Sequence, residues 1–353
     1  MIKTKGLTRD EQYIKRCFQI ANLGLGATKT NPVVGCVIVH KEQIIGEGYH
    51  EKYGEGHAEV NAFKSVKSEH LPLLKASTVY VSLEPCFHFG KTPPCVNLIL
   101  KHQVPRVVIS LLDPFPEVAG KSIQKLQNHG IEVVTGILTT EGAFTARRFL
   151  TNVKHQRPYI ILKFAQSKDG FMGKNDEQVW FTNAISKRLV HKWRKEEDGI
   201  LIGRNTALID NPQLTNRLYF GNSPTRIIIN RKADLPNNLK IFTPDTPTIL
   251  VCEQAPIHKI SSIEYVELDF KNDFLKQLLA YLYQKKIGSM IVEGGAKTLQ
   301  SFIDADLWDE ARVFTGNKWL GSGILAPKIN KTPSKVVPIG ADELRFYYKK
   351  SSN

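Results

Sequence analysis

The chain has 353 residues, of which 42% are hydrophobic and 23% are charged. One hydrophobic core rarely organises a chain of this length, so we expect two domains. No apolar run is long enough to span a bilayer, and the first residues do not form a charged-then-apolar leader. These features exclude an integral membrane protein and predict a cytoplasmic one.

The chain is basic, with a formal net charge of +14. Such an excess attracts either a polyanion or small phosphorylated ligands, because both bind Lys and Arg through phosphate. The basic residues are scattered, with no dense basic tract and no RNA-binding signature. This distribution favours small phosphorylated ligands and predicts neither a nucleic-acid nor a membrane partner.

Strand-like and helix-like segments alternate in the first half of the chain, which predicts a sheet covered by helices. The expected helices are 10–23, 58–67, 96–101, 121–128 and 139–153. The expected strands are 33–39, 44–48, 78–83, 107–111 and 131–134.

A polar stretch, Lys154-His155-Gln156-Arg157, ends at Pro158 and interrupts this pattern. We therefore expect one domain over 1–153 and a second over 154–353. The second domain resumes the alternation, with expected strands at 159–164, 199–202, 225–229, 247–251, 289–293 and 311–314.

Two short segments of the first domain contain the residues of a catalytic zinc site. His57 and Glu59 are two residues apart, and Cys86 and Cys95 follow the expected strand 78–83. One imidazole and two thiolates make three protein ligands, which leaves the fourth position of a tetrahedral Zn²⁺ open for water. Glu59 is a spare carboxylate that can carry a proton from water to a leaving amine, as in zinc nucleobase deaminases. We expect these ligands to lie at helix beginnings, where backbone amides favour thiolates.

Two other interpretations of this site compete with a catalytic zinc ion. Cys86 and Cys95 could form a disulfide, but five cysteines in the whole chain are a sparse, odd set without a disulfide framework. A structural zinc site in an interaction module is the second alternative, and it would need a fourth protein ligand and no spare Glu59.

A glycine-rich turn in the second domain is a weaker signal. The expected strand 289–293 runs into Gly294-Gly295, and a helix is expected from Thr298. Backbone N–H groups at such a turn can bind phosphate, although many turns use two glycines only to reverse the chain. The dinucleotide fingerprint G-x-G-x-x-G is missing from the sequence.

From about Asn31 to the C-terminal region, the chain resembles the bifunctional deaminase and reductase family of riboflavin biosynthesis. In the first domain the resemblance rests on the Asn-Pro-Val-Val-Gly-Cys stretch that begins at Asn31, the long loop between the two zinc-ligand cysteines, and the segment 113–121. In the second it rests on 162–170, 210–217 and 292–295. It implies an α/β fold, with an N-terminal cytidine-deaminase-like three-layer α/β/α domain and a C-terminal dihydrofolate-reductase-like α/β domain.

The resemblance also implies an activity and its cofactors. One zinc ion would support hydrolytic deamination of 2,5-diamino-6-ribosylamino-4(3H)-pyrimidinone 5′-phosphate, and NADPH would then reduce the ribosyl to a ribityl side chain. The partner is thus a small phosphorylated pyrimidine, and a homo-oligomer is compatible with the sequence. The alternative is a zinc deaminase of another nucleobase or of tRNA with a non-catalytic C-terminal domain, against which the cysteine spacing argues.

Carried over residue by residue, the resemblance implies three sets of ligand contacts. Substrate contacts of the deaminase domain are expected at Asn31, His50, His88 and Lys91. Dinucleotide contacts are expected at Ala165, Trp180, Thr206, Asp210, Gly294 and Gly295. Pyrimidine-phosphate contacts of the reductase domain are expected at Arg194, Leu214, Arg217 and Glu293. Asn211 stands where the family often has Asp.

Overall fold

The computed structural model describes residues 6–87, 93–115, 119–174 and 179–349. The chain divides into two compact units, 1–155 and 156–353, and each is described by itself. Among the described residues, no helix combines the length and the apolar character that crossing a bilayer requires.

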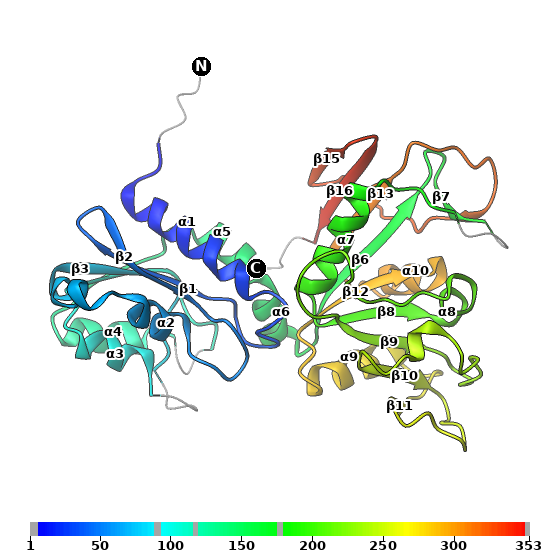
Figure 1. Ribbon diagram of the computed structural model, residues 1–353, viewed down its shortest axis with the longest axis horizontal. Coiled ribbons are helices and arrows are strands. Elements are labelled where there is room, and N and C mark those ends of the chain that lie inside the picture. The colour runs from blue at the N-terminus through cyan, green and yellow to red at the C-terminus, as the bar shows by residue number, and fades with distance from the viewer. Residues whose placement is uncertain (1–5, 88–92, 116–118, 175–178, 350–353) are drawn as a thin grey trace. The chain divides into compact units, whose positions relative to one another are not determined.

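A five-stranded mixed sheet forms the centre of unit 1 (Figure 1). Its strands lie in the order β2 (Gln43–Tyr49), β1 (Gly35–His40), β3 (Ser77–Leu83), β4 (Arg106–Leu111) and β5 (Glu132–Thr135). The β1 strand pairs antiparallel with β2 and β3, and β3, β4 and β5 are parallel. All five strands overlap the segments expected from the sequence.

Helices cover both faces of this sheet, because side chains alternate along each strand. Cys36 and Ile38 of β1 pack with α2 (Ala58–Ser65), α3 (Cys95–Lys101) and α4 (Lys121–Asn128). Val37 and Val39 face the other way and pack against α1 (Arg9–Ala21). The result is a three-layer α/β/α unit.

The last helical segment of unit 1 differs from the expectation of one helix over 139–153. The chain forms α5 (Thr139–Thr145) and α6 (Arg147–His155), with Ala146 at the break. A Cβ at Gly142 would lie 2.5 Å from the Ser110 Oγ, so α5 packs closely on the end of β4. Such a contact between distant parts of the sequence cannot be predicted from the local helical pattern. The expectation of one unbroken helix was wrong.

Unit 2 has a nine-stranded sheet at its centre. The order across the sheet is β11 (Ile263–Glu267), β10 (Thr248–Cys252), β9 (Thr225–Ile229), β8 (Gly199–Gly203), β12 (Ser289–Gly294), β6 (Tyr159–Gln166), β13 (Glu310–Thr315), β16 (Asp342–Tyr348) and β15 (Lys335–Ile339). The strands from β11 to β13 in this order are parallel, and β16 and β15 extend the sheet with antiparallel pairing. The sequence did not predict β11, β15, β16 or the small pair β7 (Phe171–Gly173) and β14 (Ile324–Leu325).

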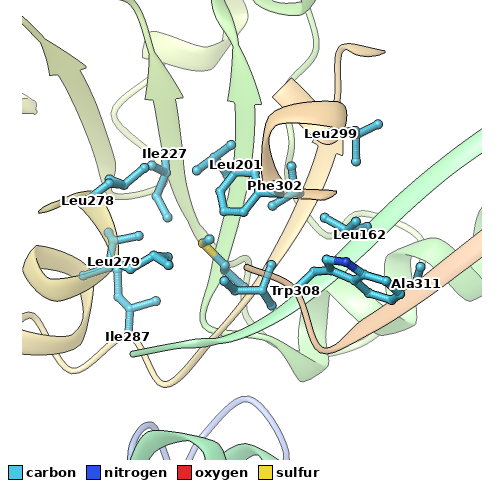
Figure 2. Packing of buried hydrophobic residues seen from close by; sticks show 14 of the residues in the cluster. Leu162, Leu201, Ile227, Leu278, Leu279, Ile287, Leu299, Phe302, Trp308 and Ala311 are labelled. Atoms are coloured by element: carbon cyan, nitrogen blue, oxygen red, sulfur yellow. The ribbon is translucent and has the colours of Figure 1, made fainter. Parts of the chain in front are cut away.

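The central strands of unit 2 are apolar on both faces, as parallel strands between helices require. Leu162 and Leu201 point to one face, where α9 (Phe274–Gln284) and α10 (Ala296–Asp304) cover them, and Figure 2 shows this packing around Phe302 and Trp308. On the other face, α7 (Ala184–Glu196) covers Ile161, and α8 (Arg204–Asp210) packs with the cluster around Ile202.

Close packing of α2 on β2 generates the first prediction. A Cβ at Gly48 would lie 2.2 Å from the Ala62 backbone nitrogen, and backbone cannot move aside as a flexible side chain does. Gly48→Ala should therefore lower the free energy of unfolding by about 3 kcal/mol, the upper range for overpacking. Calorimetry should record a lower Tm, whereas the control Gly6→Ala, where a Cβ meets no atom within 4 Å, should unfold like the parent.

Candidate active sites

Three zinc-ligand candidates converge in unit 1 from separate elements. His57 is the N-cap of α2, Cys95 is the first residue of α3, and Cys86 follows β3. Their potential ligand atoms all lie within 4.8 Å of one another. The Nδ1 of His57 lies 3.5 Å from the Cys86 Sγ and 3.4 Å from the Cys95 Sγ. Cys86 itself does not begin a helix, so that part of the expectation was wrong.

The chemistry of this donor set fits a zinc ion. Both cysteines are free rather than disulfide-bonded, and the Cys95 backbone N–H donates to the Cys86 Sγ at 3.2 Å. Hydrogen bonds from Cys95 and His57 lower the pKa of the Cys86 thiol below its usual range, although burial opposes this. Thiolate sulfur and imidazole nitrogen are the ligands that Zn²⁺ prefers, and three of them leave one position open.

Glu59 lies in the first turn of α2, two residues from His57, and its side chain is buried. Burial, together with the negative charge of Cys86, raises the pKa of Glu59 to about 7. A carboxyl group with such a pKa can both accept and donate a proton near neutral pH, as a general acid–base catalyst must.

Asn31 and His50 form a hydrogen-bonded pair in the same unit. The His50 Nδ1 lies 3.1 Å from the Gly56 carbonyl oxygen, and its Nε2 lies 3.3 Å from the Asn31 Nδ2. A neutral imidazole with its proton on Nδ1 satisfies both contacts, and burial lowers the pKa of His50. This arrangement leaves the Oδ1 of Asn31 as an acceptor.

One cavity of about 350 Å³ brings these groups together. The residues expected from the sequence that line it are Asn31, His50, His57, Glu59 and Cys86. Sequence reasoning missed Tyr53, Asp113, Phe115 and Phe149, which also line it. His88 and Lys91 lie outside the described residues.

The dinucleotide residues expected in unit 2 cluster at the ends of three neighbouring parallel strands. Ala165 lies near the end of β6, the Gly294-Gly295 turn follows β12, and Thr206 lies in α8 just after β8. A Cβ at Gly295 would lie 3.1 Å from the Thr206 Oγ1. The carboxyl edge of a parallel sheet is where such folds bind ligands.

The other two dinucleotide candidates are less enclosed. Asp210 ends α8, and burial raises its pKa. Trp180 is 58% exposed, with the Lys187 Nζ 4.9 Å from the centre of its ring. The cofactor role of Asp210 and Trp180 stays a prediction.

A buried ion cluster joins α7 to the end of β12. The Arg194 Nε and Nη2 donate to the two carboxylate oxygens of Glu293 at 3.0 and 2.8 Å. The Lys163 Nζ lies 3.8 Å from the same carboxylate. Burial raises the pKa of Glu293, but Arg194 and Lys163 outweigh it and lower the pKa to about 2. Sequence reasoning missed Lys163, although one cation inside an apolar strand was the signal.

The remaining two expected substrate residues have different surroundings. The Arg217 Nη1 donates to the Thr215 Oγ1 at 2.7 Å, and its backbone N–H donates to the Nδ1 of His191 at 3.0 Å. Leu214 packs in the hydrophobic core beside Ile202. The contact of Leu214 with the substrate stays a prediction.

Comparison with known proteins finds a different family model for each of two regions of the chain. The family model for the cytidine and deoxycytidylate deaminase zinc-binding region matches residues 7–111, and the model for the RibD C-terminal domain matches 158–336. The riboflavin biosynthesis protein RibD of Aquifex aeolicus is 37% identical, covering 96% of this chain and 98% of its own. The chain belongs to the RibD family. RibD of Escherichia coli is 33% identical, with 89% of each chain covered.

Solved structures agree with this family assignment. A deaminase/reductase from Thermotoga maritima has a TM-score of 0.87 at 34% identity, with 96% of this chain and 98% of that one covered. RibD from Acinetobacter baumannii has a TM-score of 0.84 at 32% identity, covering 97% and 99%. These matches confirm the predicted fold class, the bifunctional deaminase and reductase, and the cofactors Zn²⁺ and NADPH. They do not support the alternative of another nucleobase or tRNA deaminase with a non-catalytic second domain.

The ligand geometry predicts about one zinc ion per chain. A Cys86→Ser, Cys95→Ser double variant removes both thiolates and should lose most of its zinc in metal analysis of the purified protein. Cys17→Ser is the matched control, because the Cys17 Sγ contacts the Tyr80 carbonyl oxygen away from the ligand cluster. Full zinc content in the double variant would contradict the ligand assignment.

The contact between Gly295 and Thr206 gives a prediction for the cofactor. Gly295 has a φ of −71°, outside the left-handed region that favours glycine, and a side chain there would meet Thr206. Gly295→Val should weaken NADPH binding at least tenfold in a fluorescence titration, because phosphate could no longer approach the turn. Deamination by the same protein serves as the internal control and should be unchanged. NADPH affinity equal to that of the parent would show that the turn is only structural.

Proposed function

We propose that residues 1–153 hydrolytically deaminate 2,5-diamino-6-ribosylamino-4(3H)-pyrimidinone 5′-phosphate and that residues 154–353 then reduce its ribosyl to a ribityl side chain with NADPH. The observation that carries the proposal is the buried Glu59 in one cavity with His57 and Cys86. Membership of the RibD family supports the two-step assignment, as does the name of the Thermotoga relative, which is both a diaminohydroxyphosphoribosylaminopyrimidine deaminase and a 5-amino-6-(5-phosphoribosylamino)uracil reductase.

In the first step the C2 amine leaves as ammonia and water supplies the oxygen that replaces it. His57, Cys86 and Cys95 would hold a zinc ion, which would supply the Lewis acidity that makes water nucleophilic near neutral pH. Glu59 accepts one proton from the attacking water and passes it to the ring nitrogen. It then takes the proton of the new hydroxyl group and gives it to the amine, so that the C–N bond breaks and ammonia leaves. With its N–H group held by His50, Asn31 offers Oδ1 to an N–H on the ring edge.

In the second step C1′ of the ribosylamine accepts a hydride that NADPH would supply, the C1′–O4′ bond of the ribose breaks, and O4′ takes a proton from water to become a hydroxyl of the ribityl chain. The Gly294-Gly295 turn would hold the cofactor through backbone N–H groups. Glu293 is shared by Arg194 and Lys163, so the cluster carries two cations for one carboxylate. Together with Arg217, this charge balance favours a phosphorylated substrate. Because Arg194 already forms two hydrogen bonds with Glu293, we assign it mainly the positioning of that carboxylate.

We also propose a cytoplasmic location and no nucleic-acid partner. The scattered basic residues of the chain and its small phosphorylated substrate account for the positive charge without a polyanion.

Glu59→Gln tests the proposed function most directly. The amide keeps the size of the side chain but cannot carry a proton, so deamination should fall by roughly 10²-fold or more. The assay is mass analysis of the product formed from the diaminopyrimidine phosphate without NADPH. Zinc content should equal that of the parent.

The same variant provides the control for the second activity. Given the deaminated 5-amino-6-(5-phosphoribosylamino)uracil and NADPH, it should oxidise NADPH at nearly the parental rate, because Glu59 and Glu293 belong to different units. Loss of both activities in a folded, zinc-loaded protein would mean that the two reactions share one site.

A further inference from the structure

A buried carboxylate beside the zinc ligands holds a separate loop in place. Glu84 is buried two residues before Cys86. Its Oε2 accepts hydrogen bonds from the backbone N–H groups of Asp113 and Gly120 at 3.2 and 3.0 Å, and its Oε1 accepts from the Ser122 Oγ at 2.6 Å. One side chain thus links Asp113, Gly120 and Ser122 to the short stretch between the end of β3 and the proposed metal ligand Cys86.

This segment carries an aromatic side chain into the deaminase cavity. The Phe115 N–H donates to the Asp113 Oδ1 at 2.9 Å, which closes a tight turn at the anchored end of the loop. Phe115 is 45% exposed and lines the cavity. Phe149 of α6 lines it too, and the two ring centroids are 6.2 Å apart at an interplanar angle of 66°.

The cavity therefore combines two kinds of surface. Its polar groups, His57, Glu59 and Cys86, suit the edge of a ring where an amine is exchanged. Those groups are directional and cannot by themselves hold a planar ring against tilting, whereas an aromatic face attracts it by stacking. The edge-to-face contact with Phe149 restrains the Phe115 ring while part of it stays open to the cavity.

We propose that Phe115 stacks on the pyrimidine ring of the deaminase substrate and that Glu84 is the residue that positions it. This inference rests on the proposed deamination and adds the contact that recognises the face of the ring. Phe115 acts on binding and Glu84 acts through the loop, so both should influence KM more than the proton transfer.

The first experiment measures deamination without NADPH for Phe115→Leu and Phe115→Tyr. Stacking of a base on an aromatic residue is lost on truncation at a cost equivalent to about 5- to 150-fold in affinity. We expect KM to rise within this range for Phe115→Leu, with kcat changed less than threefold, and Phe115→Tyr to keep a KM near that of the parent. Zinc content and Tm should stay parental in both.

Phe144→Leu is the matched control. Phe144 of α5 is 47% exposed, similar to Phe115, but it does not line the cavity and has the Arg147 guanidinium 4.2 Å from its ring centre. Its KM should be that of the parent. A parental KM for Phe115→Leu in an enzyme that deaminates would overturn the stacking contact, whereas a parent without deamination would overturn the proposed function instead.

The positioning role of Glu84 is tested with variants of Glu84 and of a residue that donates a hydrogen bond to it. Glu84→Gln weakens the contacts with the loop, and Ser122→Ala removes one of them at the end of the segment remote in sequence from Cys86. Both variants should raise KM, as Phe115→Leu does. When either is combined with Phe115→Leu, KM should not rise above that of Phe115→Leu alone. Lower zinc content with an unchanged KM would show that Glu84 supports the position of Cys86 and not that of Phe115.

Discussion

Direct contact between the backbones of β2 and α2 is the constraint on which the deaminase site depends. Gly46 and Gly48 have no side chain, and a Cβ at either would lie less than 3 Å from a backbone atom of Ala62. Only glycine allows the helix to lie this close to the strand. The N-terminal end of the same helix carries His57 as its N-cap and Glu59 in its first turn.

The other site residues come from three places near this helix: the segments after β2 and β3 and the start of α3. The segment after β3 carries Cys86 and the first residue of α3 is Cys95, whereas the loop after β2 carries His50. The Cys95 N–H and the carbonyl oxygen of Gly56 each form a hydrogen bond with one of the site's side chains. Two of the proposed site residues, Cys86 and His50, are thus oriented by backbone groups of rigid elements, which preorganises the proposed site before substrate arrives.

In unit 2 the sheet topology brings residues from separate elements together. Strands β8, β12 and β6 are adjacent and parallel, so their carboxyl ends meet at one edge. Lys163 and Glu293 come from adjacent strands, and Arg194 comes from α7. A buried carboxylate between two cations has its charge compensated, which is the condition for keeping it ionised away from water. The cluster retains a positive charge that suits a phosphorylated ligand.

Local patterns in the sequence were enough to predict the chemistry of the deaminase site and the class of fold. The spacing of His57 and Glu59, the paired cysteines and the apolar strands are readable from neighbouring residues. The partners of Arg194 and the core position of Leu214 became known from the folded structure, since Arg194 pairs with Glu293, 99 positions away. Phe115, Glu84 and Lys163 escaped prediction for the same reason. Their roles come from contacts across elements, and no local periodicity encodes which loop or strand will lie beside a given side chain.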